Sequence, residues 1–288
     1  MQLICDELSK ALGKPVEYHG SQPIGGGCIN NASKLETSTG TYFLKRNNAA
    51  FAKAFEVEAA ALEEMAVTRS IRIPEPITHG VAGAEAFLVL EYIDMHPAQP
   101  SSHARAGTQL AALHSNTSDK FGWKHDNTIG ATQQPNPLTS SWVAFYRDHR
   151  LDHQFKIARD QTGKSFQGKD KLLTNLDAFF ETYTPEPSLL HGDLWGGNIG
   201  FDPKGDPVLF DPATYYGDRE TDLAFTEMFG GFRQEFYQAY NEAKPLDPGY
   251  NVRKSLYNLY HYLNHHNLFG GGYAGTAQSL IDQLLRQL

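Results

Sequence analysis

The feature that most constrains this chain is a polar segment, His191-Gly-Asp-Leu-Trp-Gly-Gly-Asn198, which is followed by the apolar run Val208-Leu-Phe and then by Asp211. Asp193 is suited to orient an acceptor hydroxyl, and both Asn198 and Asp211 offer the oxygen ligands that Mg²⁺ prefers. Phosphoryl transfer requires mainly an aligned acceptor and cations that neutralise the phosphates. Each residue alone would be explained as part of a polar turn or a strand end. Their joint spacing instead predicts a site for phosphoryl transfer.

A glycine-rich segment near the N-terminus is a second candidate site. Its glycines could let backbone N–H groups approach nucleotide phosphates, and they are Gly25, Gly26 and Gly27. The run fits neither the Walker pattern nor a strict G-x-G-x-x-G, and a flexible turn would explain it by itself. Only the residues that follow this run favour a phosphate-binding turn over a simple flexible one.

The next of these residues is a lysine at the end of a strand predicted over residues 41–45. Lys45 could hold phosphates as a point charge, and Glu58 on the following helix could hold Lys45 in place. Glu56 is the competing partner, because the phase of the predicted helix does not distinguish the two glutamates. Each residue alone would be explained as a surface charge. Their position upstream of the Asp–Asn–Asp set favours a nucleotide site.

Hydrophobic periodicity divides the chain into two parts. The elements predicted in the first part are helices at 1–12 and 49–65 and strands before residue 25 and at 33–37, 41–45 and 86–92. Those predicted in the second part are a helix capped by Ser101 or Ser102, helices at 142–155, 169–180, 223–240 and 252–268, a short helix after Gly270, and short strands at 189–190 and 208–210. The predicted fold class is α+β and bilobal. A small β-rich nucleotide-binding lobe spans residues 1–93, and a larger, mainly helical catalytic and substrate-binding lobe spans residues 94–288.

An extended segment closes the first lobe. The backbone C=O and N–H groups of Glu91, Tyr92 and Ile93 could bind the edge of adenine, while neighbouring apolar side chains form the slot for its ring. A simple core strand explains the same residues, and the two interpretations are compatible.

The charge balance limits the partners. The chain has 25 Lys and Arg against 33 Asp and Glu, a formal net charge of −8, which does not attract nucleic acid or anionic lipid. Two cysteines are too few for a disulfide framework. The first residues lack the cationic start of a signal peptide, and the longest strongly apolar stretch is too short to span a bilayer. We therefore expect a cytoplasmic enzyme with no nucleic-acid or membrane partner.

The order of these candidate residues resembles the phosphotransferase branch of the protein-kinase superfamily, which includes the aminoglycoside and choline kinases. Nearly the whole chain is similar, more specifically, to the fructosamine (ketosamine) 3-kinase family. The segments that carry this resemblance are Asp126-Asn-Thr-Ile-Gly130, Gln134-Pro-Asn136, Trp142…Phe145…Arg150-Leu151, the segment from His191 to Asn198, Asp211-Pro-Ala-Thr-Tyr-Tyr-Gly-Asp-Arg-Glu220, Phe229-Gly-Gly-Phe232 and residues 259–270. They argue against a kinase for an aminoglycoside, choline or a free sugar. The intact Lys, Asp and Asn set argues against a pseudokinase.

The resemblance implies a kinase-like fold that uses ATP and Mg²⁺ to phosphorylate the third-carbon hydroxyl of a ketosamine, a sugar attached to a free or protein-borne amine by glycation. The phosphorylated adduct then decomposes and releases the amine, which is a deglycation repair. Asp193 would act on the acceptor, and Asn198 and Asp211 would bind Mg²⁺. Lys45 would hold the phosphates, and Trp195 would form an apolar wall against the sugar. Which ketosamine sugar is preferred stays open.

Cys28 lies in the glycine-rich turn, at a position where many members of the family carry a cysteine. The resemblance implies a redox switch, in which oxidation of the thiol links two chains or blocks the phosphate site. A small side chain packed under a loop is the alternative. The protein is accordingly expected to be a monomer or a redox-dependent dimer.

Four polar residues on the predicted helix 252–268 could serve the acceptor. His261 and His265 are four residues apart and could bind a metal, but no third ligand lies nearby in the sequence. We favour packing, or hydrogen bonding near the acceptor pocket together with His266 and Asn267. His266 is therefore a candidate substrate-binding residue.

Two features around the catalytic segment have structural interpretations. Asp211-Pro-Ala replaces the Asp-Phe-Gly of the wider kinase pattern, which argues against a mobile regulatory switch at this point. Arg219 and Glu220, with Asp222 close by, are expected to form a network behind the catalytic segment. Direct contact of these residues with substrate is the less favoured interpretation.

Overall fold

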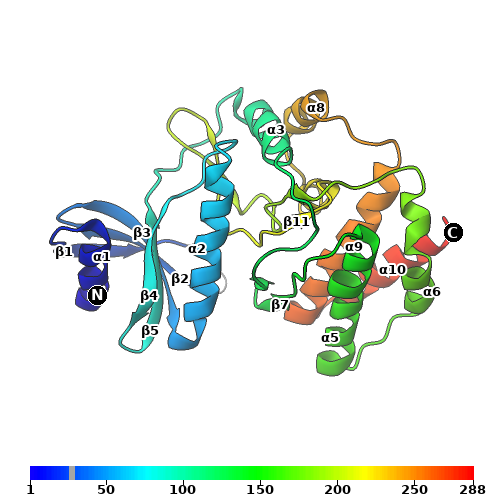
Figure 1. Ribbon diagram of the computed structural model, residues 1–288, viewed down its shortest axis with the longest axis horizontal. Coiled ribbons are helices and arrows are strands. Elements are labelled where there is room, and N and C mark those ends of the chain that lie inside the picture. The colour runs from blue at the N-terminus through cyan, green and yellow to red at the C-terminus, as the bar shows by residue number, and fades with distance from the viewer. Residues whose placement is uncertain (26–29) are drawn as a thin grey trace.

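The computed structural model describes residues 1–25 and 30–288. A β-rich part lies at one side and a mainly helical part at the other, in the predicted order along the chain (Figure 1). The predicted α+β class is therefore confirmed. Between Glu91 and Ser102 the chain forms no helix or strand, which is consistent with a connection between two lobes.

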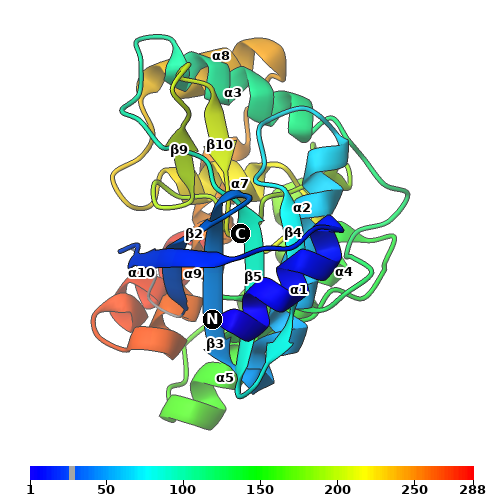
Figure 2. The ribbon, with the colours of Figure 1, turned by 90° about the vertical axis from the view of Figure 1, so that its left-hand side faces the viewer.

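The first part is one antiparallel sheet of five strands in the order β1-β2-β3-β5-β4. The strands are β1 (Tyr18–Pro23), β2 (Asn31–Thr37), β3 (Gly40–Asn48), β4 (Pro76–Ala82) and β5 (Glu85–Glu91). Helix α1 (Gln2–Leu12) crosses one face (Figure 2), and α2 (Ala52–Val67) covers the other, next to the helical part (Figure 1). A 3₁₀ turn at Ala49–Phe51 leads into α2.

Strand β5 is apolar at successive positions because both of its faces are covered. Phe87 and Val89 pack against α1, whereas Leu88 packs with α2 on the opposite face. This alternation follows from the pleat of a strand. In the neighbouring β3, Lys45 pairs with Leu88 across the ladder, and directly paired residues share a face. Lys45 is thus directed toward α2 and the helical part.

The second part consists of helices joined by loops and by three short strand pairs. The helices are α3 (Ser102–Leu113), α4 (Trp142–Tyr146), α5 (Asp152–Thr162), α6 (Lys169–Thr174), α7 (Glu220–Thr226), α8 (Gln234–Ala243), α9 (Tyr250–Phe269) and α10 (Tyr273–Leu285). The strand pairs are β6 (Asn127–Ile129) with β7 (Thr132–Gln134), β8 (Ser188–Leu189) with β11 (Tyr216–Gly217), and β9 (Ile199–Phe201) with β10 (Pro207–Leu209). Within the described residues, none of the helices has both the length and the apolar character needed to cross a membrane.

Several predicted elements were wrong in detail. The single helix predicted over 223–240 is two helices, because Gly230 and Gly231 adopt φ of 92° and 72° and interrupt it. Ser101 is the N-cap residue of α3, one of the two serines predicted, but its side chain makes no capping hydrogen bond. The Ser102 hydroxyl donates to the Gly205 carbonyl (2.7 Å). A π turn at Arg147–Leu151 interrupts the helix predicted over 142–155. The segment predicted as a helix over 169–180 ends as the 3₁₀ turn Leu176–Phe180.

Candidate active site

A cavity of about 1290 Å³ opens between the sheet with α2 and the helical part. It is larger than the usual pocket for one small ligand, so it has room for a nucleotide and an acceptor. Lys45 and Glu58 line it from the first part, and Asp193, Asn198 and Asp211 line it from the second. The structure therefore brings together residues that are up to 166 positions apart in the sequence.

The segment that carries Asp193 is fixed from behind by Asp222 of α7. The Asp222 carboxylate accepts hydrogen bonds from the amides of His191 and Gly192, both at 2.8 Å, and lies 3.1 Å from Nε2 of buried His114. Burial alone would raise the pKa of Asp222, but the bonds from His114 and the loop amides lower it, so the carboxyl stays ionised. This arrangement confirms a structural role for Asp222 behind the catalytic segment.

A close contact with the backbone of Ala213 requires a glycine at position 192. Its φ is 82°, and a Cβ at this position would lie 2.1 Å from the carbonyl oxygen of Ala213. Next to it, Nε2 of His191 donates to the carbonyl of Phe210 (2.9 Å), and Nδ1 accepts from the amide of Asp193 (3.2 Å). Burial lowers the pKa of His191, which keeps this ring neutral. The histidine therefore joins the Asp193 segment to the one that carries Asp211.

Asp193 has the properties of a proton acceptor near neutral pH. Burial raises its pKa to about 7, and the nearby Asp211 and Asp222 carboxylates add to the rise. Nδ2 of Asn198 donates to Oδ2 of Asp193 (3.1 Å) and to its backbone carbonyl (2.7 Å). This bond orients the carboxylate and partly offsets the shift. A base with a pKa close to the working pH is well matched to general-base catalysis.

Asn198 and Asp211 are neighbours because they flank the β9–β10 pair. The amide of Phe210 donates to the Asn198 carbonyl (3.2 Å), one residue beyond the last ladder pair. Asp211 has φ of 58°, a conformation that non-glycine residues adopt rarely and often at functional sites. Since the Asn198 amide nitrogen serves Asp193, its Oδ1 remains to bind a cation. An amide and a carboxylate oxygen fit Mg²⁺, which takes few protein ligands and completes its shell with phosphates and water.

Lys45 lies within β3, which continues to Asn48, rather than at the strand end as predicted. Its Nζ donates to Oε1 of Glu58 (2.6 Å) and forms an ion pair with Asp211. Burial would lower the pKa of Lys45, but these two carboxylates raise it above its usual value. Glu56 instead pairs with exposed Lys53 at 2.7 Å. The structure thus settles which glutamate contacts Lys45.

The segment Glu91–Ile93, here called the hinge, joins the two parts of the chain. All three of its residues line the same cavity. The Glu91 side chain pairs with Arg72, and its amide donates to the Glu75 carbonyl at 2.8 Å. The backbone groups of Ile93 make no hydrogen bond to any described residue. A backbone donor and acceptor that face a cavity without protein partners suit an adenine edge.

The glycine-rich turn is described only in part. Gly25 lines the cavity, whereas the predictions for Gly26, Gly27 and Cys28 fall outside the described residues. The proposed redox switch and the redox-dependent dimer therefore stay predictions.

Aromatic side chains form the other end of the cavity, beyond Asp193. Trp195 is 39% exposed, and its ring lies 6.1 Å from that of Phe229, which in turn lies 5.1 Å from the ring of His265. Trp195 thus lies where an apolar wall was expected. Sequence reasoning placed His265 near the acceptor pocket as one of two alternatives. It did not identify Phe229 as a lining residue, although the four-residue spacing of Phe225 and Phe229 was a usable signal.

His266 was predicted on the wrong face of α9. It is buried against Phe166, and its Nε2 lies 3.3 Å from the Thr162 hydroxyl, away from the cavity that His265 lines. A difference of one residue rotates a helical side chain by about 100°, which explains the error. His261 stacks on Phe225 with ring centroids 3.6 Å apart. No cluster of three metal-ligating residues is found in the described part of the chain. His261 and His266 are buried packing residues, whereas His265 lines the cavity.

Glu220 and Arg219 also contribute to the predicted network. Arg253 of α9 bonds to both carboxylate oxygens of buried Glu220, at 2.7 and 2.9 Å, and to Asp247 at 2.8 Å. Nη1 of Arg219 donates to the Tyr240 hydroxyl (3.1 Å), which also contacts His114. The network therefore links α3, α7, α8 and α9 beneath the catalytic segment.

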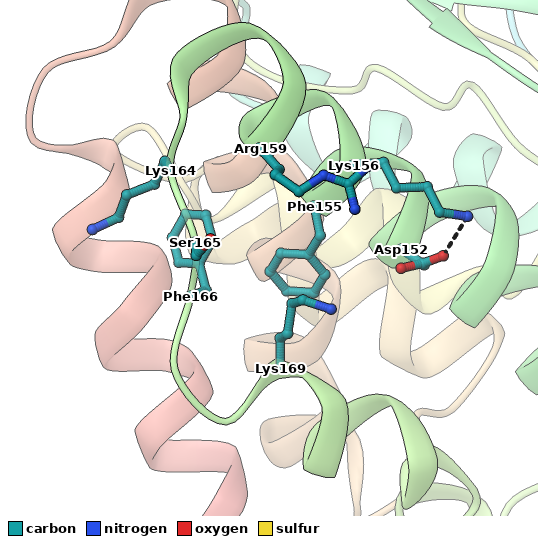
Figure 3. Close-up of a pocket in the computed structure, with 8 residues that line it drawn as sticks. All are labelled: Asp152, Phe155, Lys156, Arg159, Lys164, Ser165, Phe166 and Lys169. Atoms are coloured by element: carbon teal, nitrogen blue, oxygen red, sulfur yellow. Dashed lines mark ion pairs between the residues drawn. The ribbon is translucent and has the colours of Figure 1, made fainter.

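A second hollow of about 60 Å³ lies where α5, the following loop and α6 meet (Figure 3). The basic side chains that line it are Lys156, Arg159, Lys164 and Lys169. Lys156 pairs with Asp152 at 2.7 Å. Arg159 pairs with Asp160 at 2.7 Å, and Lys169 pairs with Asp170 at 2.6 Å. Because carboxylates compensate most of the positive charge, this hollow is a weak anion site at best, and we assign it no function.

Comparison with known proteins gives consistent matches over the whole chain. A model of the fructosamine kinase family matches residues 1–287. A probable ketoamine kinase of Synechocystis is 46% identical over 99% of this chain and 97% of its own length. The chloroplastic protein-ribulosamine 3-kinase of Arabidopsis thaliana is 44% identical over 96% of this chain and 86% of its own.

Solved structures agree with these sequence matches. A putative fructosamine-3-kinase from Haemophilus somnus has a TM-score of 0.91 at 31% identity, covering 98% of this chain and 96% of its own. An aminoglycoside phosphotransferase, solved with ADP and hygromycin B, has a TM-score of 0.62 at 18% identity and covers 99% and 98%. The second likeness is one of fold alone, and it confirms that the architecture is kinase-like.

Proposed function

Because the chain belongs to the fructosamine kinase family and is a phosphotransferase, we propose that it transfers the γ-phosphoryl group of ATP to the 3-hydroxyl of a ketosamine. The phosphorylated adduct would then decompose and release the amine, which repairs a glycated small molecule or protein. The observation that carries the proposal is that Lys45, Asp193, Asn198 and Asp211 all face one cavity.

The geometry of the cavity supports a role for each of these residues. Lys45, held protonated by its carboxylate neighbours, would bind the phosphates, and the backbone of Glu91–Ile93 would bind adenine. Asn198 and Asp211 would hold Mg²⁺, which neutralises the charge of the phosphates when it is bound. All of these residues line the one cavity.

On the acceptor side, Asp193 would accept the hydrogen bond of the 3-hydroxyl and take its proton during in-line transfer. Its carboxylate is oriented for this by Asn198 (3.1 Å). Trp195 would pack against the carbon face of the sugar, since aromatic rings provide a large and rigid apolar surface.

An assay of ATP consumption tests the proposed reaction. The panel contains lysine-borne fructosamine and ribulosamine, the corresponding free sugars, an aminoglycoside and choline. ATP turnover that depends on a ketosamine is expected. Turnover only with another alcohol would replace the proposal by a different small-molecule kinase, and the absence of turnover with every acceptor would favour a nucleotide-binding regulatory module.

The pKa of Asp193 predicts a pH dependence. A carboxylate must be deprotonated to accept a proton, so kcat/KM should fall as the pH falls through about 7 and level off above it. The measurement is kcat/KM from about pH 5 to 9, with the stability of the enzyme checked at each pH. A profile that is flat through neutrality would contradict the role of Asp193 as base.

A further inference from the structure

A short hairpin forms one wall of the cavity although it is too small to be stable by itself. Strands β6 and β7 have three residues each and are joined at Gly130, whose φ of 60° suits a tight turn. Isolated two-stranded hairpins are marginal in water. Thr128, Gly130 and Gln133 of this hairpin nevertheless line the cavity, so contacts with the rest of the protein must set its position.

The hairpin lies at the acceptor end of the cavity. Asn264 of α9 donates to the Ile129 carbonyl at 3.5 Å, and the next residue of α9, His265, is in ring contact with Phe229. Phe229 contacts Trp195, which follows Asp193 by two residues. The wall therefore continues the surface against which the acceptor would bind.

Burial alternates along the two strands, and two of the buried residues, Asn127 and Ile129, also line the cavity. Asn127, Ile129, Thr132 and Gln134 are buried. Thr128 and Gln133 are directly paired across the ladder; Thr128 is half-buried and Gln133 is exposed. Paired residues project on the same face. A hydroxyl and a carboxamide are thus presented together at the cavity, and both can hydrogen-bond to the hydroxyls of a sugar.

Buried side-chain amides attach the hairpin to the catalytic segments. Nδ2 of Asn127 donates to the Thr214 carbonyl (2.8 Å), and Nε2 of Gln134 donates to the Ala213 carbonyl (3.2 Å). The Ala213 amide in turn donates to the carbonyl of His191 (2.9 Å). The hairpin is therefore bonded to the chain just after Asp211 and, through one residue, to the segment that carries Asp193.

Arg150 completes this network from the other side. Its Nη2 donates to Oδ1 of Asn136 (2.6 Å), and Nδ2 of Asn136 donates to Oδ1 of Asn127 (3.0 Å). Its Nη1 donates to the Pro135 carbonyl at 2.7 Å. The guanidinium lies 4.1 Å from the ring of Tyr215. Two rigidly spaced donors therefore hold the segment directly after β7.

The burial of Arg150 is costly. The residue is fully buried, and among the described residues its guanidinium donates to carbonyl and amide oxygens, with no carboxylate partner. Removing a charge from water without an opposite charge destabilises a protein strongly. A planar guanidinium is suited to fixing several acceptors in one geometry, as it does here. Because Arg150 bonds to Pro135 and Asn136, directly after β7, this fixed geometry holds the β6–β7 hairpin in position.

We propose that the β6–β7 hairpin selects the acceptor: Thr128 and Gln133 bind the hydroxyls of the sugar part of the ketosamine, and Arg150 is the positioning residue that holds them at the correct distance from Asp193. The inference rests on the proposed function, because it names where that function recognises its acceptor. It assigns a role to the segments 126–136 and 142–151, which the phosphoryl-transfer site itself does not use.

Kinetics of four variants test this proposal. Thr128→Val and Gln133→Ala change cavity-facing groups and are expected to raise the KM for the ketosamine about tenfold, since each removes a hydrogen bond to substrate. The KM for ATP should stay within about twofold. Arg150→Met should also raise the KM for the ketosamine, because the hairpin would be displaced. It should in addition alter the ratio of the kcat/KM values for fructosamine and ribulosamine. Arg147→Met is the matched control, because Arg147 lies on the same turn, is partly exposed and, among the described residues, pairs only with Asp148.

The outcomes separate the two proposals. If wild-type enzyme uses no ketosamine, the proposed function fails. If wild-type enzyme is active and Thr128→Val and Gln133→Ala leave the ketosamine KM unchanged, the hairpin inference fails alone. An Arg150→Met variant that loses only thermal stability, with both KM values and the sugar ratio unchanged, would show that Arg150 is merely structural. Should Arg150→Met not fold, the two hairpin variants still decide.

Discussion

Replacement of Asp193 by Asn is expected to lower kcat by about 10²- to 10⁴-fold. The amide has nearly the same shape and can still bond to Asn198, but it cannot accept the proton of the acceptor hydroxyl. ATP binding should be largely unchanged, because Lys45 and the hinge are intact. The two measurements are kcat with a ketosamine and the Kd for ATP.

Asp170→Asn is a suitable control for this variant. The Asp170 side chain is 87% exposed, and its one ion pair within the described part of the chain is with Lys169, so its replacement should change neither quantity. Near-normal turnover of Asp193→Asn would remove Asp193 from the reaction. A large loss of ATP affinity would indicate instead that the substitution disturbs the whole site.

A second large effect is expected for Asp211→Asn, which should reduce kcat by at least about 10²-fold. The amide is a much weaker ligand for Mg²⁺ than the carboxylate. The Mg²⁺ concentration required for half-maximal activity should therefore rise. In Asp193→Asn the Mg²⁺ requirement should be unchanged, so a Mg²⁺ titration distinguishes a metal ligand from a base.

The same substitution should have little effect on stability. Asn tolerates the positive φ of residue 211 at least as well as Asp does. It can also still accept a hydrogen bond from Lys45, which keeps its ion pair with Glu58 (2.6 Å). We expect the free energy of unfolding to change by no more than about 1 kcal/mol, as measured by denaturant titration. If the loss of activity were accompanied by global unfolding, the assignment of Asp211 to the metal would lose its support.

The candidate residues for phosphoryl transfer were the easiest feature of this protein to predict. Asp193, Asn198 and Asp211 were recognisable as candidates because few residue types suit phosphoryl transfer and because short apolar strands flank them. The long apolar run of β5 was equally recognisable, since a strand covered by α1 and α2 must be apolar on both faces. These signals are local in the sequence, so no tertiary information was needed to identify them.

The sequence did not predict which side chains of a helix face the cavity. The pattern of α2 indicated a helix but did not distinguish Glu58 from Glu56, and the pattern of α9 led to His266 where the structure directs His265 into the cavity. The break between α7 and α8 at Gly230 and Gly231 was visible in the sequence but was outweighed by the apolar residues around it.

The sequence by itself determined the fold class, the candidate phosphoryl-transfer residues and the order in which they occur. Only the tertiary structure decided which side chains meet, such as Arg150 with Asn136 and Asn127 with Thr214. The physical reason is that periodicity reports which residues of an element are buried, not against which distant partner they are buried. That choice depends on how the elements rotate and pack together, and it is made by contacts between residues far apart in the chain.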